Sequence, residues 1–184
     1  MKLTGFACYL ITAFLMVLSP LSSPLASPLA SAQTQVPFGD AISNSIYNYH
    51  RHTPTIATSG SIASGGLSEL KQKGFKTIVD FRTPAEGTVQ EAKQAKALGL
   101  NYINLAVGTA WPSDELLAEF YALVEDPKQH PILLHCASAN RVGMLWAYYR
   151  LQRGMGKSGA LEEGRTIGMK PNRERVLLNK VSSF

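Results

Sequence analysis

Short apolar runs alternate with helix-like segments along most of this 184-residue chain, and this alternation limits the fold more than any other feature. The runs typical of buried strands lie at 55–58, 75–81, 100–107 and 131–135. The segments with helical character lie at 64–73, 86–98, 113–125, 141–153, 157–167 and 171–180. Repeated units of this length predict an α/β fold, in which helices flank a mostly parallel central sheet of about four to five strands. Ser64, and either Ser113 or Asp114, are expected to cap two of the helices.

The first 32 residues differ in character from the rest of the chain. They hold one charged residue, Lys2, followed by an apolar run at 6–18 and a stretch rich in Ser, Pro and Ala. That run is shorter than the ~20 residues that span a bilayer, and the small residues at 30–32 suit a signal peptidase. We therefore expect residues 1–32 to be a signal peptide cleaved after Ala32. The mature protein would be periplasmic or secreted and would have no transmembrane span, with an N-terminal extension at 33–54 and a single domain at 55–184.

Positive charge is concentrated in the last part of the sequence. Residues 150–184 contain 8 Lys or Arg against 3 Asp or Glu, whereas residues 33–149 contain 9 against 10. Apart from the terminal Phe184, no aromatic residue interleaves with these charges, and no nucleic-acid motif is present. We interpret the basic tail as a solvated helical surface and predict no nucleic-acid partner.

Cys136 is the only cysteine left after the expected cleavage, so it has no partner for an intramolecular disulfide. It follows a buried apolar run and precedes the short side chains of Ala137, Ser138, Ala139 and Asn140, then Arg141. Small residues let backbone N–H groups turn inward at the start of a helix, which makes an anion cradle. Arg141 adds a planar fork for a phosphate or another oxyanion, and the same field stabilises a thiolate.

Other polar residues fall where the expected strands end. Asp80 and Arg82 follow one strand, and parallel sheets bind ligands at the carboxyl ends of their strands. Asp80 is expected to hold Arg82 in an ion pair, and Arg82 and Glu86 to pair with each other or to draw an anion to the crevice. His135 precedes Cys136 on a buried strand, so we expect a hydrogen-bonded core histidine.

Histidine and tryptophan side chains are further candidates for ligand contacts. His50 and His52 have metal-compatible side chains, but without a third ligand we predict no metal site. Trp111 is the aromatic residue best placed to contact a substrate.

The HC…R loop resembles that of the cysteine-dependent tyrosine and dual-specificity phosphatases. The segments SGSIASGGLSELKQKGFKTIVDFRTPAEG, LGLNYINLAVG and HCASANRVGMLWAYYR together resemble the bacterial beta-lactamase-hydrolase-like phosphatase family, over about residues 55–170. This resemblance implies a dual-specificity phosphatase-like fold without a cofactor and a phosphomonoester or phosphoprotein substrate. It also implies attack by Cys136, a cysteinyl-phosphate intermediate and Arg141 as the oxyanion clamp.

The loop departs from the general tyrosine phosphatase signature at three points. Four residues, rather than five, separate Cys136 from Arg141, and Val142 stands where a Ser or Thr is usual. Ala139 replaces the loop glycine, although alanine adopts a positive φ only at a cost. The short loop and Val142 resemble traits of the bacterial family, whereas Ala139 does not.

The resemblance also implies a general acid from the loop at 108–114, where Asp114 is the only carboxylate. The position of Asp114 before an apolar helical segment favours a helix cap over an acid, and Asp80 is the alternative acid. Arg82, together with residues 137–141, is predicted to bind phosphate.

Two other functions fit the same residues. A rhodanese-like sulfurtransferase would carry a persulfide on Cys136 and would need no proton donor of the phosphatase kind. A non-catalytic phosphate-binding module would grip an anion through the loop without turnover, and Ala139 and Val142 favour it. The sequence makes no prediction of oligomeric state.

Overall fold

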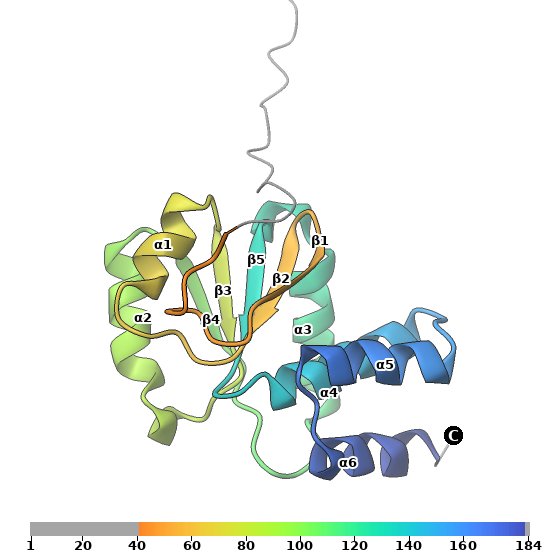
Figure 1. Ribbon diagram of the computed structural model, residues 1–184. Coiled ribbons are helices and arrows are strands. Elements are labelled where there is room, and N and C mark those ends of the chain that lie inside the picture. The colour runs from red at the N-terminus through yellow and green to blue at the C-terminus, as the bar shows by residue number, and fades with distance from the viewer. Residues whose placement is uncertain (1–40, 183–184) are drawn as a thin grey trace, which may run out of the picture. The chain divides into compact units, whose positions relative to one another are not determined.

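The computed structural model describes residues 41–182, so the expected signal peptide and residues 33–40 of the extension lie outside the described residues. Five strands form one sheet in the order β1-β2-β5-β3-β4, which confirms the predicted α/β fold (Figure 1). The strands are β1 (His50–Thr53), β2 (Ile56–Ser59), β3 (Thr77–Asp80), β4 (Asn101–Asn104) and β5 (Ile132–His135). β2, β5, β3 and β4 are parallel, and β1 runs antiparallel to β2.

Six α-helices follow the predicted segments closely. They are α1 (Gly66–Gln72), α2 (Thr88–Ala97), α3 (Asp114–Glu125), α4 (Asn140–Gln152), α5 (Lys157–Ile167) and α6 (Pro171–Val181). Two 3-10 turns, η1 (Pro84–Glu86) and η2 (Pro127–Gln129), precede α2 and β5. None of the helices within residues 41–182 is both long and apolar enough to cross a membrane.

Three local details differ from the sequence expectations. β1 lies in the segment expected to be an extension, where polar residues pair at the sheet edge without an apolar run. Ser64 does not cap α1, because Gly65 takes that position with a left-handed φ of 85° and no side-chain bond. Ser113 is the cap of α3, since its hydroxyl accepts from the N–H of Leu116 at 3.3 Å, and Asp114 is the first helical residue.

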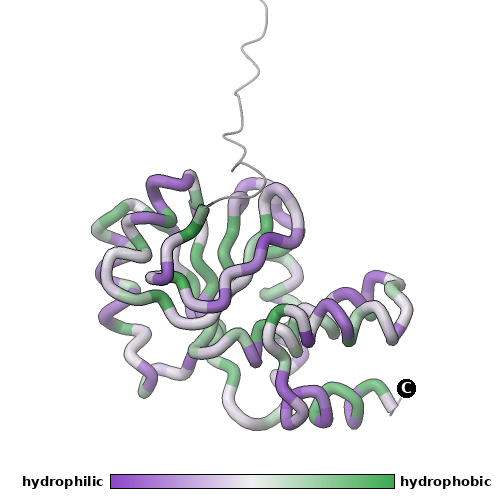
Figure 2. Tube along the Cα trace, viewed as in Figure 1, coloured by the Kyte–Doolittle hydropathy of each residue, from purple (hydrophilic) through white to green (hydrophobic). Residues whose placement is uncertain are grey.

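Alternate residues of the central strands face two separate cores. Ile132 and Leu134 of β5 pack in a large core with α3, α4, α5 and α6, whereas Leu133 packs in a smaller one with α1. Figure 2 shows the apolar residues concentrated along these strands, and Figure 1 shows α1 and α2 on the side opposite α3. This period of two explains why β5 reads as a continuous apolar run: both of its faces are covered.

Close backbone contact joins α4 to α5. A Cβ atom at Gly143 would lie 2.8 Å from the backbone nitrogen of Met169 and closer still to the carbonyl oxygen of Gly164. A Cβ atom at Gly164 would lie 2.8 Å from the carbonyl oxygen of Gly143. The two helices therefore meet where neither carries a side chain, which fixes α5 against the helix that begins at the Cys136 loop.

We expect Gly143→Ala to lower the free energy of unfolding by about 2 to 3 kcal/mol, because the new methyl group meets backbone atoms that cannot rotate away. The matched control is Gly159→Ala in α5, where the added Cβ meets only the Met155 side chain at 3.5 Å. That change should stabilise the protein by about 0.5 to 1 kcal/mol, since alanine is the better helix former. Urea unfolding of both variants checks the pair, and equal stabilities would contradict the close packing.

Candidate active site

Cys136 lies at the carboxyl end of β5, where the chain turns into α4. Its side chain is buried, and its N–H donates to the carbonyl oxygen of Ser59 at 3.4 Å. The next loop residue is also anchored, because the carbonyl oxygen of Ala137 accepts from the N–H of Ser61 at 3.2 Å. The end of β2 and the residues that follow it thus hold the start of the loop. At the other end of the loop, α4 begins at Asn140, so the positive end of its dipole lies at the loop.

Ala139 adopts a left-handed backbone conformation, which is costly for any residue with a Cβ atom. Its φ is 63°, it is fully buried, and it is the N-cap residue of α4. Room for its methyl group comes from Gly168, where a Cβ would lie 3.1 Å from the Cβ of Ala139 and 2.8 Å from Nδ2 of Asn48. Asn48 in turn donates to the carbonyl oxygen of Ile167 at 2.8 Å. Tertiary packing therefore imposes a backbone conformation that glycine would adopt without strain.

Arg141 forms a two-bond ion pair with Glu86. Nη1 donates to Oε2 at 2.8 Å and Nη2 donates to Oε1 at 2.6 Å, while Nη1 also reaches the carbonyl oxygen of Val107 at 3.2 Å. Thr83 holds Glu86 in place by donating its N–H and its hydroxyl to Oε2, at 2.8 and 2.9 Å. The bonds from Arg141 are the main cause that lowers the pKa of Glu86 to about 2. Glu86, and through it Arg141, is thus fixed in direction.

This pairing corrects the expectation that Glu86 pairs with Arg82. Its partner is Arg141, not Arg82, because the turn η1 and the bonds from Thr83 aim its carboxylate at the Cys136 loop. The sequence does contain a signal for this geometry: Thr83 and Glu86 have the spacing of a capping box, which turns the acidic side chain back toward its own N-terminus.

Arg82 lies in a buried charged cluster with Asp80 and Glu91. Its Nε lies 3.0 Å from both carboxylate oxygens of Asp80, and its Nη2 lies 2.7 Å from Oδ2 of Asp80 and 2.7 Å from Oε2 of Glu91. Tyr102 donates its hydroxyl to Oδ2 of Asp80 at 2.5 Å. The expected ion pair between Asp80 and Arg82 is therefore present.

His135 completes the charged cluster from β5. Its Nε2 lies 3.0 Å from Oε1 of Glu91 and 3.6 Å from Oδ1 of Asp80. The histidine is buried in the core as predicted, but neither ring nitrogen has a hydrogen bond of good geometry among the described residues. Its Nε2 lies within ion-pair distance of both carboxylates, but the expected hydrogen bond is not found among the described residues.

The charged cluster limits the roles that Asp80 and Arg82 can take. Burial alone would raise the pKa of Asp80, but the bonds from Arg82, the neighbouring His135 and the bond from Tyr102 lower it overall. An ionised carboxylate enclosed in this way is poorly suited to donate a proton. Arg82 bonds to two carboxylates, and in the described part of the chain no hydrogen bond joins it to residues 136–141. Its predicted phosphate contact therefore has no support from its position.

Asp114 lies at the first position of α3 and is exposed. The pKa of Tyr148 is raised mainly by burial of its hydroxyl and, to a smaller extent, by the negative charge of Asp114. The Tyr148 ring packs edge-on against Trp111, with centroids 4.8 Å apart. Asp114 and Trp111 thus lie beside the same aromatic group, and their catalytic and substrate-binding roles stay predictions.

Three metal-type ligands approach one another within residues 41–182: single ligand atoms of Asp80, Glu91 and His135 lie within 4.8 Å. Arg82 already supplies a cation between the two carboxylates, so the group is built as an ion network. The other histidines have separate partners. His52 Nε2 lies 2.9 Å from the hydroxyl of Thr58, burial is the main cause that lowers the pKa of His52 to about 4, and His50 contacts Asn48.

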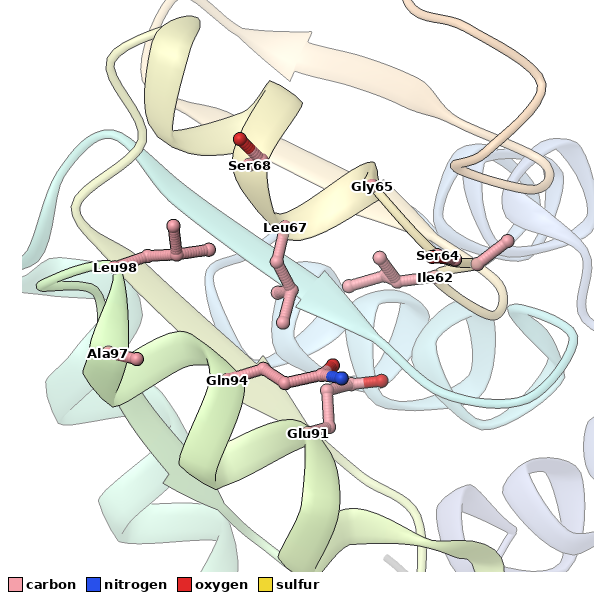
Figure 3. Close-up of a pocket in the computed structure, with 10 residues that line it drawn as sticks. Ile62, Ser64, Gly65, Leu67, Ser68, Glu91, Gln94, Ala97 and Leu98 are labelled. Carbon is pink, nitrogen blue, oxygen red and sulfur yellow. The ribbon is translucent and has the colours of Figure 1, made fainter.

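A cavity of about 460 Å³ lies between α1 and α2, and the described residues that line it do not include those of the Cys136 loop. Figure 3 shows the polar heads of Glu91 and Gln94 beside each other, facing Leu67 and Ile62. Since Glu91 also contacts Arg82 and His135, its carboxylate joins the wall of this cavity to the buried charged cluster.

The start of α6 packs against the candidate site. No pattern in the sequence predicted this contact. Oδ1 of Asn140 accepts from the N–H of Lys170 at 2.8 Å, and its Nδ2 donates to Oδ1 of Asn172 at 3.2 Å. Arg173 donates to the carbonyl oxygens of Gly108 and Thr109, at 2.6 and 3.2 Å. The interpretation of the basic tail as a solvated surface is therefore wrong for Arg173, whose guanidinium caps a loop 64 residues earlier in the chain.

Comparisons with known proteins place this geometry among phosphatases. The family model described as DSP-PTPase phosphatase fused to NAD+ Kinase matches residues 40–176. Over 82 residues, 41% of this chain, the sequence is 39% identical to Probable NAD kinase 2, chloroplastic, from Oryza sativa subsp. japonica, and it covers 8% of that protein's length.

Two solved structures are similar over most of the chain. A cysteine-to-serine variant of P. aeruginosa TpbA in complex with pTyr is 25% identical, with a TM-score of 0.60, and 75% of this chain and 86% of that one are covered. The core catalytic domain of the PP-IP phosphatase SIW14 from S. cerevisiae is 16% identical, with a TM-score of 0.60 and coverage of 78% and 94%. The second likeness concerns the fold. The narrower resemblance to the beta-lactamase-hydrolase-like family stays a prediction.

We expect Asp80→Asn to lower the free energy of unfolding at about pH 7 by roughly 3 kcal/mol, because it leaves Arg82 short of one buried partner. The folded-state pKa of Asp80 lies below its ordinary value of 3.8, so its contribution is full above that value and is lost as the pH falls below it. The gap between the wild type and the variant should therefore shrink at about pH 3. Urea unfolding at both pH values measures it. The exposed Glu119→Gln serves as the control, and a gap of equal size at both pH values would contradict the role of the carboxylate.

Proposed function

The chain belongs to the family described as DSP-PTPase phosphatase fused to NAD+ Kinase, and on this basis we propose that it is a cysteine-dependent phosphomonoester hydrolase. The observation that carries the proposal is the position of Arg141 relative to Cys136. Bonds to Glu86 are the main cause that raises the pKa of Arg141, and neighbouring Cys136 contributes to the same shift. A fixed guanidinium next to a buried thiol, at the N-terminus of α4, is an arrangement that holds a phosphate against a nucleophile.

One edge of the Arg141 guanidinium is bonded neither to Glu86 nor to Val107, and it is the proposed substrate edge. An arginine has five N–H donors, and two on Nη1 and one on Nη2 already bond to Glu86 and Val107. The remaining donors, on Nε and Nη2, lie on the same edge of the planar group. That edge suits two equatorial oxygens of a phosphate, while Glu86 keeps the guanidinium from turning.

In the proposed reaction, Sγ of Cys136 attacks phosphorus, a P–S bond forms and the ester P–O bond breaks. The leaving oxygen takes a proton, for which Asp114 is the proposed donor, since Asp80 lies in the buried charged cluster. Water then attacks phosphorus of the cysteinyl phosphate and gives a proton to the Asp114 carboxylate, while the P–S bond breaks, inorganic phosphate leaves and the thiolate is restored. Backbone N–H groups of residues 137–141 and the free edge of Arg141 stabilise the charge of both transition states.

The proposed substrates are phosphotyrosine-like or small phosphomonoesters. The TpbA structure contains pTyr, and a likeness at 25% identity supports this class. We also propose that the protein acts after export, following cleavage near Ala32, because residues 1–32 have the layout of a signal peptide.

The purified chain should hydrolyse para-nitrophenyl phosphate in the presence of EDTA, and Cys136→Ser should abolish this activity. The hydroxyl of serine is a far weaker nucleophile than a thiolate, because it is not ionised near neutral pH. Release of nitrophenol measures the reaction, and thiosulfate-to-cyanide transfer is measured on the same samples. Hydrolysis that survives Cys136→Ser, or that needs added metal, would overturn the mechanism. Sulfur transfer without hydrolysis would favour the sulfurtransferase.

Arg141→Lys should be nearly as inactive as Arg141→Ala, because lysine keeps the charge but loses the planar fork. At about 3 to 4 kcal/mol for a lost oxyanion contact, turnover should fall by roughly 10² to 10³. The control is Arg175→Lys on the exposed side of α6, which should keep wild-type turnover. Steady-state kinetics, with folding checked by circular dichroism, decide the outcome. Near-wild-type turnover in Arg141→Lys would remove Arg141 as the clamp.

A further inference from the structure

Arg173 brings a second guanidinium to the edge of the candidate active site. It lies in the first turn of α6, is partly buried, and reaches the loop after β4 through the carbonyl oxygens of Gly108 and Thr109. Val107, the residue before Gly108, accepts a bond from Arg141. The two guanidinium groups therefore bind neighbouring carbonyl groups of one loop.

The position of Arg173 is electrostatically unfavourable in the free protein. A cation in the first turn of a helix opposes the helix dipole, and the N-terminus of α4 adds a second positive end nearby. Burial lowers the pKa of Arg173, and the positive charge of Arg141 lowers it further, against smaller opposing effects of Cys136 and Glu86. Glu86 already bonds to Arg141, and within residues 41–182 no ion pair involves Arg173. The N-termini of α4 and α6 add positive potential to that of the two guanidinium groups at this end of the site, which a bound anion would balance.

Arg173 also retains donors for a ligand. Among the described residues it uses one N–H on Nη1 and one on Nη2, so three of its five donors are free. The two carbonyl bonds fix the plane of the guanidinium, which reduces the entropy lost when it binds an anion. The same bonds anchor α6, and the bonds of Asn140 to Lys170 and Asn172 hold this helix to the Cys136 loop.

We propose that Arg173 forms a second anion subsite beside the Cys136 loop, and that the favoured substrates are small phosphomonoesters with a second phosphate close to the reacting one. This inference rests on the proposed function, since Arg141 and the loop must hold the first phosphate. A single phosphate fills the cradle and leaves Arg173 without a counter-charge. A diphosphate or neighbouring bisphosphate group supplies an anion to both guanidinium groups.

Binding of two unreactive ligands tests the proposal without turnover. Methylphosphonate carries one phosphonate group and methylenediphosphonate carries two, and both are titrated calorimetrically into the full chain with EDTA at one fixed salt concentration. The wild type should bind the diphosphonate about tenfold more tightly, as expected for one added charge-assisted contact. Arg173→Gln should lose this preference while its affinity for methylphosphonate stays within about twofold. The matched control Arg175→Gln, two residues further along α6, should keep the preference.

The outcomes separate a ligand contact from a structural one. If Arg173 only anchored the loop at 108–109, Arg173→Gln would weaken both ligands in parallel, and the proposal would be overturned. Equal binding of the two ligands by the wild type, or a preference that survives in Arg173→Gln, would also overturn it and leave the proposed hydrolysis standing. Failure of the wild type to bind either ligand would overturn both. Arg173→Met, which keeps the aliphatic stem, replaces the glutamine variant if that variant does not unfold cooperatively.

Discussion

The ion pairs of the buried Arg82 guanidinium hold together the elements on which the rest of this fold depends. It lies between Asp80 at the end of β3 and Glu91 on α2, and Glu91 continues the contact to His135 on β5. Burying these charges is costly unless each is paired, so the two strands and the helix keep one relative position. Cys136 follows His135 directly, and the cluster therefore positions the strand end at which the Cys136 loop begins.

The candidate active site is arranged differently, because its two guanidinium groups are not enclosed by carboxylates. In the Arg82 cluster, carboxylates surround the cation on several sides. At the Cys136 loop, Arg141 pairs with Glu86, α4 begins at Asn140, and Lys170, the N-cap residue of α6, donates its N–H to Asn140. A site of this kind is pre-organised for an anion, because little rearrangement is needed when the anion arrives.

The sequence predicted the strands, the helices and the Cys136 loop because each depends on local patterns. Alternating or continuous apolar runs define the strands, and the loop is contiguous from Cys136 to Arg141. β1 was missed because an edge strand with polar residues lacks an apolar run. The partners of Glu86 and the position of Arg173 were missed for another reason. Both depend on contacts between residues 55 or more positions apart, which form only in the folded chain.

The contacts of α6 with the Cys136 loop have a consequence for the order in which the site is assembled during synthesis. The chain emerges from its N-terminus, so β5, Cys136 and Arg141 are made before Asn172 and Arg173. Until those later residues have appeared, Asn140 lacks its bonds to α6, and the carbonyl groups of Gly108 and Thr109 lack their cation. A nascent chain that ends before α6 therefore carries Cys136 and Arg141 without the contacts that α6 makes with the surrounding loops.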